Sequence, residues 1–596
     1  MALRIEDYAI IGDCQAAALV GKDGSIDWLC LPRFDSDACF AALLGDAENG
    51  RWRIAPAGPV TRTRRTYSGD TLVLETEFDT ASGTVALVDF MPIRQSVPDL
   101  VRIVQGRSGR VRMRMDLALR FDYGSTVPWV QRVDGGITAM AGPDAVHLHT
   151  PVATHGEGLT TVAEFDVEAG ERIPFVLTWY RSFDPVPAPA DPEEALAHAL
   201  QWWGEWSGRC RYEGHRRDLV MRSLITLKAL TYEPSGGIVA AATASLPEQL
   251  GGVRNWDYRF CWLRDATLTL LAFLNAGYTS EALAWEQWLL RAVAGNPRQA
   301  QIMYGLGGER RLPESEIPWL AGYEGSRPVR IGNAAHAQFQ LDVFGEVADA
   351  LYHAAKAGLK PGEDGWGLQR ALVNWAAEVW QEPDEGIWEV RGPRQHFTHS
   401  KVMAWVAVDR AIRSAELFDL EGPIDDWKAI RQAIHDRVCR DGFDEGLNSF
   451  VQAFGSRELD ASVLMIPIVG FLPADDPRVA GTVAAIERHL LRDGFVLRYD
   501  SARSEDGLPP GEGTFLPCTF WLADNYALAG RRREARAVFD RVADLCNDVG
   551  LLSEEYDHRA RRLVGNFPQA FTHLGLVNTA FNLSRPRGPH ESRELG

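Results

Sequence analysis

The stretch Val402-Met-Ala-Trp-Val-Ala-Val408 is apolar on every side when it is written as a helix. By contrast, Arg531-Arg-Arg-Glu-Ala-Arg-Ala-Val-Phe-Asp-Arg-Val542 carries charges along one side of a helical pattern. A helix that is apolar all round is buried, whereas an amphipathic helix covers the outside of a core. These two stretches therefore predict an inner and an outer helix.

Segments of both kinds follow one another from about residue 215 to residue 584, and long Gly/Pro-rich loops alternate with short ones between them. We expect twelve helices, at 216–231, 265–276, 280–294, 333–357, 363–381, 398–417, 424–439, 459–467, 476–490, 514–529, 531–547 and 568–583. Twelve helices in inner and outer pairs predict an (α/α)6 barrel over 215–584, with its function on the long loops at one end.

The sequence before this region has the period of β-strands. Val111–Leu119 alternates polar and apolar residues, Val85–Phe90 is a short apolar run, and glycines and aspartates separate such runs. Half-buried strands at this spacing are typical of an antiparallel β-sandwich. We expect the sandwich to span residues 1–184.

Two further segments flank the predicted barrel. Pro185-Val-Pro-Ala-Pro-Ala190 has the composition of a stiff linker. Asp191, followed by Pro192 and two glutamates, has the pattern of a helix start. We therefore expect a linker with a helix at 185–214, and a disordered tail at 585–596, where the chain turns polar with proline and glycine.

The composition excludes several classes of function. The 596 residues are 46% apolar and 24% charged, as in ordinary globular proteins. The net charge of −19 leaves no basic surface for nucleic acid or for an anionic membrane. No apolar run approaches the ~18 residues of a membrane span. We expect a small-molecule partner rather than a nucleic acid or a membrane.

The eight cysteines are scattered, without a Cys-x-x-Cys pair. This spacing favours buried thiols over a disulfide framework or a zinc site. The first residues lack a charged-then-apolar signal pattern, so we expect a cytoplasmic protein. Motifs for dinucleotides, P-loop nucleotides and His-Glu-x-x-His zinc are missing from the sequence, and we expect neither a cofactor nor a metal.

Two groups of acids point to chemistry. Gly386-Ile-Trp-Glu-Val-Arg-Gly-Pro-Arg-Gln-His-Phe-Thr398 places Glu389 beside a tryptophan, and Leu552-Ser-Glu-Glu-Tyr-Asp557 supplies Glu554 and Glu555. Hydrolysis of a glycosidic bond requires two carboxyl groups, one as acid and one as base. The chain has 81 acidic residues, and most acids are solvated surface charges. The pattern alone is therefore weak.

Four segments, in this order, resemble glycoside hydrolase family 15, the glucoamylases and their bacterial and archaeal relatives, including trehalases. The segments are Trp262-Leu-Arg-Asp265, Tyr304-Gly-Leu-Gly-Gly-Glu309, Trp388-Glu389 and Ser553-Glu-Glu555. The start of the chain, Ile11–Cys14 with Gly24–Asp35, resembles the bacterial members, which carry a β-sandwich ahead of the barrel. The resemblance covers nearly the whole chain, and Pro32–Asp35 is where the sandwich could reach the site.

The resemblance implies an inverting, exo-acting hydrolase that releases β-glucose from the non-reducing end of an α-glucoside. Glu389 would be the general acid, with Trp388 as the apolar neighbour that raises its pKa. Glu554 would be the general base, ionised in a more solvated and hydrogen-bonded setting, and Glu555 competes with it for that role. An inverting pair needs about 6.5–9.5 Å between its carboxyl groups to leave room for water.

The resemblance also implies contacts with the terminal sugar. Arg264 and Asp265 would hydrogen-bond its hydroxyls, although a helix cap with an ion pair explains the same two residues. Trp262 and Trp256 would stack on a sugar face, or pack in the core.

Four residues besides Trp388 are expected in or near the site. Arg498 would contact the sugar, together with Trp388. Glu309 would touch sugar or orient a loop. Lys401 could meet the leaving group together with His399, and a polar helix start explains these two equally well.

One position departs from the family. Fungal glucoamylases follow the acid with a second glutamate that holds the leaving sugar, whereas Val390 and Arg391 follow it here. Recognition of the leaving group has therefore changed. We expect a small cytoplasmic α-glucoside, trehalose first, with malto- or isomalto-oligosaccharides as the alternative. The rivals are an inverting phosphorylase, which would lack the base, and a non-catalytic sugar-binding protein, which would lose one carboxylate.

Overall fold

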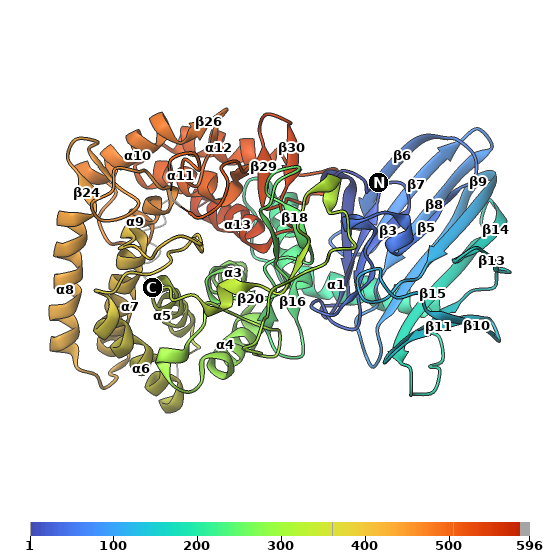
Figure 1. The fold of residues 1–596 in the computed structure, drawn as a ribbon, viewed down its shortest axis with the longest axis horizontal. Helices are drawn as coiled ribbons and strands as arrows, with labels where there is room; N and C mark the ends of the chain where they lie inside the picture. The colour runs from blue at the N-terminus through green and yellow to red at the C-terminus, as the bar shows by residue number, and fades with distance from the viewer. Residues whose placement is uncertain (1, 360–361, 505, 585–596) are drawn as a thin grey trace.

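The computed structural model describes residues 2–359, 362–504 and 506–584, so the tail expected at 585–596 lies outside the described residues. Figure 1 shows β-sheets at one end of an elongated molecule and a ring of helices at the other. Among the described helices, none combines the length and the apolar character that crossing a membrane requires.

The N-terminal part consists of two antiparallel sheets that share one long strand, β9 (Asp99–Ala118). The first half of β9 pairs with β8 (Gly83–Phe90) and β15 (Arg172–Arg181). Its second half pairs with β5 (Arg51–Pro56) and β14 (Thr160–Glu168). Apolar side chains from both halves lie in one hydrophobic core. The predicted β-sandwich is confirmed, with β9 passing from one sheet to the other.

The other strands extend these two sheets. The first sheet has the order β1-β2-β3-β5-β9-β14-β13 with β4 beside β3, and the second has the order β6-β7-β8-β9-β15-β12-β11-β10. Their bounds are β1 Tyr8–Gly12, β2 Ala17–Gly21, β3 Ser25–Cys30, β4 Ala38–Phe40, β6 Val60–Tyr67, β7 Leu74–Thr80, β10 Trp129–Val133, β11 Gly136–Ala141, β12 Asp144–His149 and β13 His155–Glu157.

Helix α1 (Pro192–Ser207) joins the sandwich to the helical part. Asp191 caps its first turn by accepting two backbone N–H groups, as the sequence predicts. One face of α1 packs on the sandwich, and Trp206 donates its Nε1–H to Glu281 of helix α4 (Thr279–Val293) at 2.8 Å. The sandwich also contacts the helical part directly, since Trp28 donates its Nε1–H to the carbonyl oxygen of Ala242 at 2.8 Å.

The helical part forms a barrel of two layers (Figure 1). Its inner helices α3, α5, α7, α9, α11 and α13 contact one another in a closed ring, and the outer helices pack against them. The bounds are α2 Arg217–Ala229, α3 Leu263–Ala276, α4 Thr279–Val293, α5 Asp342–Lys356, α6 Glu363–Val379, α7 Thr398–Phe418, α8 Ile424–Asp441, α9 Met465–Ile468, α10 Pro477–His489, α11 Leu516–Leu528, α12 Arg532–Ala543 and α13 Ala570–Ser584. The predicted (α/α)6 barrel is confirmed.

Two helices begin well after their predicted first residues. The helix expected from residue 333 begins at Asp342, because Gln338 lies in an extended segment and donates its side-chain N–H to the carbonyl oxygens of Glu389 and Val390, each at 3.1 Å. Helix α9 is short because the turn before it, Ala461–Leu464, is a 3-10 helix.

The inner helices all begin at the same end of the barrel, because inner and outer helices alternate in direction along the chain. The loops that enter the inner helices therefore meet at this end. They carry short hairpins such as β18 (Ala244–Pro247) with β19 (Asn255–Asp257), and the three-stranded sheet β28 (Thr514–Phe515), β29 (Glu555–Asp557) and β30 (Arg562–Val564).

Candidate active site

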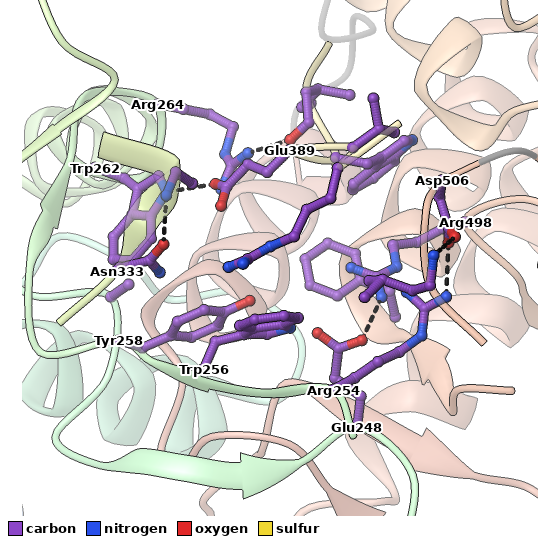
Figure 2. Close-up of a pocket in the computed structure, with 18 of the residues that line it drawn as sticks. Glu248, Arg254, Trp256, Tyr258, Trp262, Arg264, Asn333, Glu389, Arg498 and Asp506 are labelled. Carbon is purple, nitrogen blue, oxygen red and sulfur yellow. Dashed lines mark hydrogen bonds and ion pairs between the residues drawn. The ribbon is translucent and has the colours of Figure 1, made fainter. Parts of the chain in front are cut away.

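A pocket opens where these loops meet (Figure 2). Among the described residues, none from the N-terminal sandwich lines it. Polar and aromatic side chains dominate the wall: Glu248, Arg254, Trp256, Tyr258, Trp262, Arg264, Asp265, Asn333, Trp388, Glu389, Arg391, Arg498, Tyr499, Asp506, Phe515 and Gln569. Charged groups with aromatic faces are suited to hold a sugar.

Glu389 lies in the loop between α6 and α7 and has a left-handed backbone, with φ of +57°. A non-glycine residue in this conformation is strained, and such strain gathers at functional sites. The indole of Trp262 donates its Nε1–H to Oε1 of Glu389 at 2.6 Å. Burial raises the pKa of Glu389, although the Arg264 guanidinium and the Trp262 N–H oppose this rise. The raised pKa is the direction that a general acid needs.

Trp388, which precedes Glu389 in the sequence, does not donate its N–H to Glu389 but to Asp460. Its Nε1–H lies 2.9 and 3.0 Å from the two carboxylate oxygens of Asp460. Its ring packs edge-on against Phe515 and at a tilt against Trp521. Trp388 therefore forms part of the aromatic wall, and the hydrogen bond to Glu389 comes from Trp262.

Arg264 and Asp265 lie in the first turn of α3 and line the pocket together. Arg264 donates from Nε to Asp265 at 2.9 Å and from Nη1 to the carbonyl oxygen of Ile387 at 2.8 Å. Because Ile387 is two residues before Glu389, the guanidinium also ties α3 to the loop that carries this carboxyl. The pair places donors and acceptors on the pocket wall, and Arg264 also holds the loop that carries Glu389.

Glu554 lies just before β29 and has no exposed surface. It accepts a hydrogen bond from the hydroxyl of Tyr258 at 2.7 Å and another from the backbone N–H of Asn566 at 3.1 Å. Tyr258 lines the pocket, so this hydrogen bond connects Glu554 to the pocket wall. Two donors on one carboxyl favour its ionised form.

Carboxyl oxygens of Glu248, Glu554 and Glu555 lie within 4.8 Å of one another. The Arg498 guanidinium neutralises part of this group, since its Nη2 lies 2.8 Å from Glu248, 2.7 Å from Glu512 and 3.1 Å from Glu555. Figure 2 shows Glu248 and Arg498 across the pocket from Glu389.

The expectation that Glu554 is solvated is wrong. Burial, together with the nearby Glu248 carboxylate, raises the pKa of Glu554 to about 8. Burial also raises the pKa of Glu555 far above its usual range, and Arg498 opposes this rise. Glu554 accepts hydrogen bonds from the Tyr258 hydroxyl and the Asn566 N–H, whereas Glu555 faces the Arg498 guanidinium, which Glu248 and Glu512 share. The two hydrogen bonds make Glu554 the better candidate for a base.

Comparison with known proteins assigns the family. Residues 214–581 match the model of "Glycosyl hydrolases family 15", and residues 1–194 match that of "Trehalase-like, N-terminal". The chain belongs to glycosyl hydrolase family 15. As a member of this family it is a glycoside hydrolase.

Relatives of this family 15 hydrolase span nearly its whole length. It is 37% identical to "Trehalase" of Mycobacterium tuberculosis over 98% of this chain and 90% of the relative. It is 36% identical to "Trehalase" of Thermoplasma acidophilum over 94% and 97%. A bacterial glucoamylase complexed with acarbose has a similar structure, with a TM-score of 0.71 over 99% of this chain and 95% of the other, at 12% identity. This last likeness supports the fold.

Three residues expected in the site of the family 15 hydrolase do not line the pocket: Glu309, Lys401, and Glu554, which is connected to it through Tyr258. Glu309 is outside the pocket, because its carboxylate pairs with Arg33 of the sandwich at 3.0 Å and accepts the Gly307 N–H at 2.7 Å. Lys401 is behind the loop of Glu389, where its ammonium donates to the carbonyl oxygen of Glu382, and burial lowers its pKa to about 8. Pro32–Asp35 thus reaches the barrel but not the pocket.

Several pocket residues were not expected from the sequence. Tyr258 lies in the same stretch as Trp262 and Arg264, so its neighbourhood carried a signal. Glu248, Arg254 and Asp506 lie in irregular loops without a recognisable pattern. Arg254 donates to Asp506 at 2.6 Å, and this buried pair closes one side of the pocket.

Proposed function

We propose that this family 15 hydrolase cleaves α,α-trehalose with inversion, with Glu389 as general acid and Glu554 as general base. The observation that supports the proposal is that two differently held carboxyl groups are tied to one pocket: Glu389 lines it, and Glu554 accepts a hydrogen bond from Tyr258, which lines it. Glu389 receives a single indole N–H, whereas Glu554 receives a hydroxyl and a backbone N–H.

In the proposed reaction Glu389 gives its proton to the glycosidic oxygen as the bond from this oxygen to the anomeric carbon breaks. Water attacks the anomeric carbon from the opposite face and gives its proton to Glu554. The attacked sugar is released as β-glucose. The leaving sugar keeps its own configuration and is released as α-glucose.

Arg264 and Asp265 are proposed to hold the hydroxyls of the attacked sugar. Their mutual hydrogen bond of 2.9 Å fixes donors and acceptors in one orientation before substrate arrives. Positioning of this kind can supply several kcal/mol of the reduction in the barrier.

Trehalose is proposed for two reasons. The relatives that cover nearly the whole chain carry the name trehalase, and the residues after the acid are Val390 and Arg391 rather than a second glutamate. We also propose a cytoplasmic location, since the eight cysteines are free thiols, and domain limits at 1–184, 185–214 and 215–584.

The test is glucose release from trehalose, maltose and isomaltose in parallel, each with and without orthophosphate. The proposal expects the largest kcat/KM on trehalose and free glucose as the only product. Glucose 1-phosphate formed with orthophosphate would identify a phosphorylase, and a higher kcat/KM on maltose or isomaltose would overturn the substrate.

A further inference from the structure

We propose that Arg391 recognises the leaving sugar and thereby determines the specificity for a disaccharide. The inference rests on the proposed function, because it assigns the leaving-group side of the same pocket. Lys401, which the sequence suggested for that role, does not line the pocket, and the family's second glutamate is replaced by Val390.

The Arg391 side chain is held in a defined place on the pocket wall. Its Nη1 and Nη2 donate to the two carboxylate oxygens of Glu314 at 3.2 and 2.8 Å. The centre of its guanidinium lies 4.2 Å from the ring centroid of Trp256, which lines the pocket (Figure 2). Bidentate pairing and stacking together orient a guanidinium, and lysine cannot reproduce either.

Arg330 supports this arrangement from outside the pocket lining. Its guanidinium lies 4.6 Å from the centroid of the same Trp256 ring, and its Nε lies 3.7 Å from Glu314. Glu314 and Trp256 are therefore shared between two arginines. Burial opposes the ionisation of Glu314, but both arginines lower its pKa. Arg330 remains beside Glu314 when the Arg391 side chain is removed.

The backbone of Arg391 is anchored independently of its side chain. Its N–H donates to the carbonyl oxygen of Asp506 at 2.9 Å. The Asp506 carboxylate is held in turn by Arg254 at 2.6 Å and by the Tyr499 hydroxyl at 2.8 Å. Truncation of the side chain should therefore leave the loop of Glu389 where it is.

The location and chemistry of Arg391 fit the leaving sugar. It follows Glu389 by two residues, and Glu389 is the proposed donor of the proton to the leaving oxygen. A guanidinium has five N–H donors, of which the hydrogen bonds to Glu314 use two, and 31% of the Arg391 side chain is exposed. The remaining donors can bind vicinal hydroxyls of the leaving glucose.

The experiment compares a disaccharide with a substrate that has no leaving sugar. Arg391→Ala is assayed on trehalose and on α-D-glucosyl fluoride, whose leaving group is fluoride. We expect kcat/KM on trehalose to fall about 10- to 150-fold, because hydrogen bonds from a charged donor are lost. On the fluoride we expect a change of less than about threefold, because the contacts to its glucosyl group do not involve Arg391. Arg391→Lys should lie between the wild type and Arg391→Ala on trehalose.

Arg394→Ala is the matched control. Arg394 is on the same loop, pairs with Glu385 at 2.9 Å and stacks over Phe339 at 5.5 Å from its centroid, but it does not line the pocket. We expect Arg394→Ala to change kcat/KM by no more than about threefold on either substrate, because a surface ion pair contributes little free energy.

Equal losses on both substrates in Arg391→Ala would overturn the inference in favour of a role in catalysis or folding, and no loss on trehalose would overturn it outright. If the wild type prefers another disaccharide, the proposed substrate is wrong. The loss of kcat/KM in Arg391→Ala on that disaccharide, compared with the loss on the fluoride, then still decides the role of Arg391.

Discussion

Tyr258→Phe tests the link between the pocket wall and the proposed base. The hydroxyl donates to Glu554 at 2.7 Å, and a hydrogen bond to a charged group contributes about 1.5–3 kcal/mol. Since about 1.36 kcal/mol corresponds to one pKa unit, its loss should raise the pKa of Glu554 by about 1–2 units. That pKa already lies at about 8, because burial and Glu248 disfavour the carboxylate.

The consequence depends on pH in a defined way. Below its pKa, the ionised fraction of a carboxyl falls tenfold for each unit by which the pKa rises. At pH 6 we therefore expect kcat/KM of Tyr258→Phe to be about 10- to 100-fold below that of the wild type. As the pH rises past the pKa of Glu554 in the variant, this ratio should return towards one, because Glu554 is then ionised in both proteins.

The assay is kcat/KM on trehalose between pH 5 and the highest pH at which both proteins remain folded. Tyr304→Phe is the control, since the Tyr304 hydroxyl is buried outside the pocket and accepts the Gln301 N–H at 2.9 Å. A loss in Tyr258→Phe that is the same at every pH would refute the reasoning, because the hydroxyl would then act on something other than the ionisation of Glu554.

Three other substitutions have defined outcomes. Glu389→Gln should lose nearly all turnover while equilibrium binding of trehalose stays, because the amide cannot supply the proton; near-wild-type activity would remove the acid assignment. Arg264→Ala should raise KM and lower kcat together, since this guanidinium orients both sugar and the Glu389 loop, and unchanged kinetics would exclude the clamp. Arg102→Met should lower stability by about 3–5 kcal/mol in urea unfolding, because it strands the buried Asp89 now paired at 2.7 Å; a change as small as that of an exposed ion pair would contradict this.

Much of the fold could be predicted because it depends on local periodicity. The inner segment Val402–Val408 lies in α7, and the outer segment Arg531–Val542 lies in α12 with Arg531 as its N-cap residue, as their patterns indicate. The sharing of β9 between two sheets could not be predicted. Only its second half, near Val111–Leu119, alternates clearly, while the change of sheet depends on pairing with strands far away in the chain.

The site was predictable where a motif fixes both residue and role. Glu389 and Arg264 line the pocket as their motifs suggest, whereas Glu309 and Lys401 do not. The direction of a side chain in a loop or a first helical turn depends on partners, such as Arg33 for Glu309 and the carbonyl oxygen of Glu382 for Lys401, that no local pattern reveals. The prediction of a solvated environment for Glu554 failed for a similar reason. Its pKa depends on burial and on Glu248, which lies far away in the sequence.

Anomer-resolved proton NMR of trehalose hydrolysis tests the central claim most directly. Inversion by Glu389 and Glu554 predicts that α-glucose and β-glucose appear in equal amounts in the first spectra, before mutarotation, with the β-anomer from the attacked sugar. The initial appearance of α-glucose alone would mean retention of configuration and would contradict the proposed pairing of the two carboxyl groups.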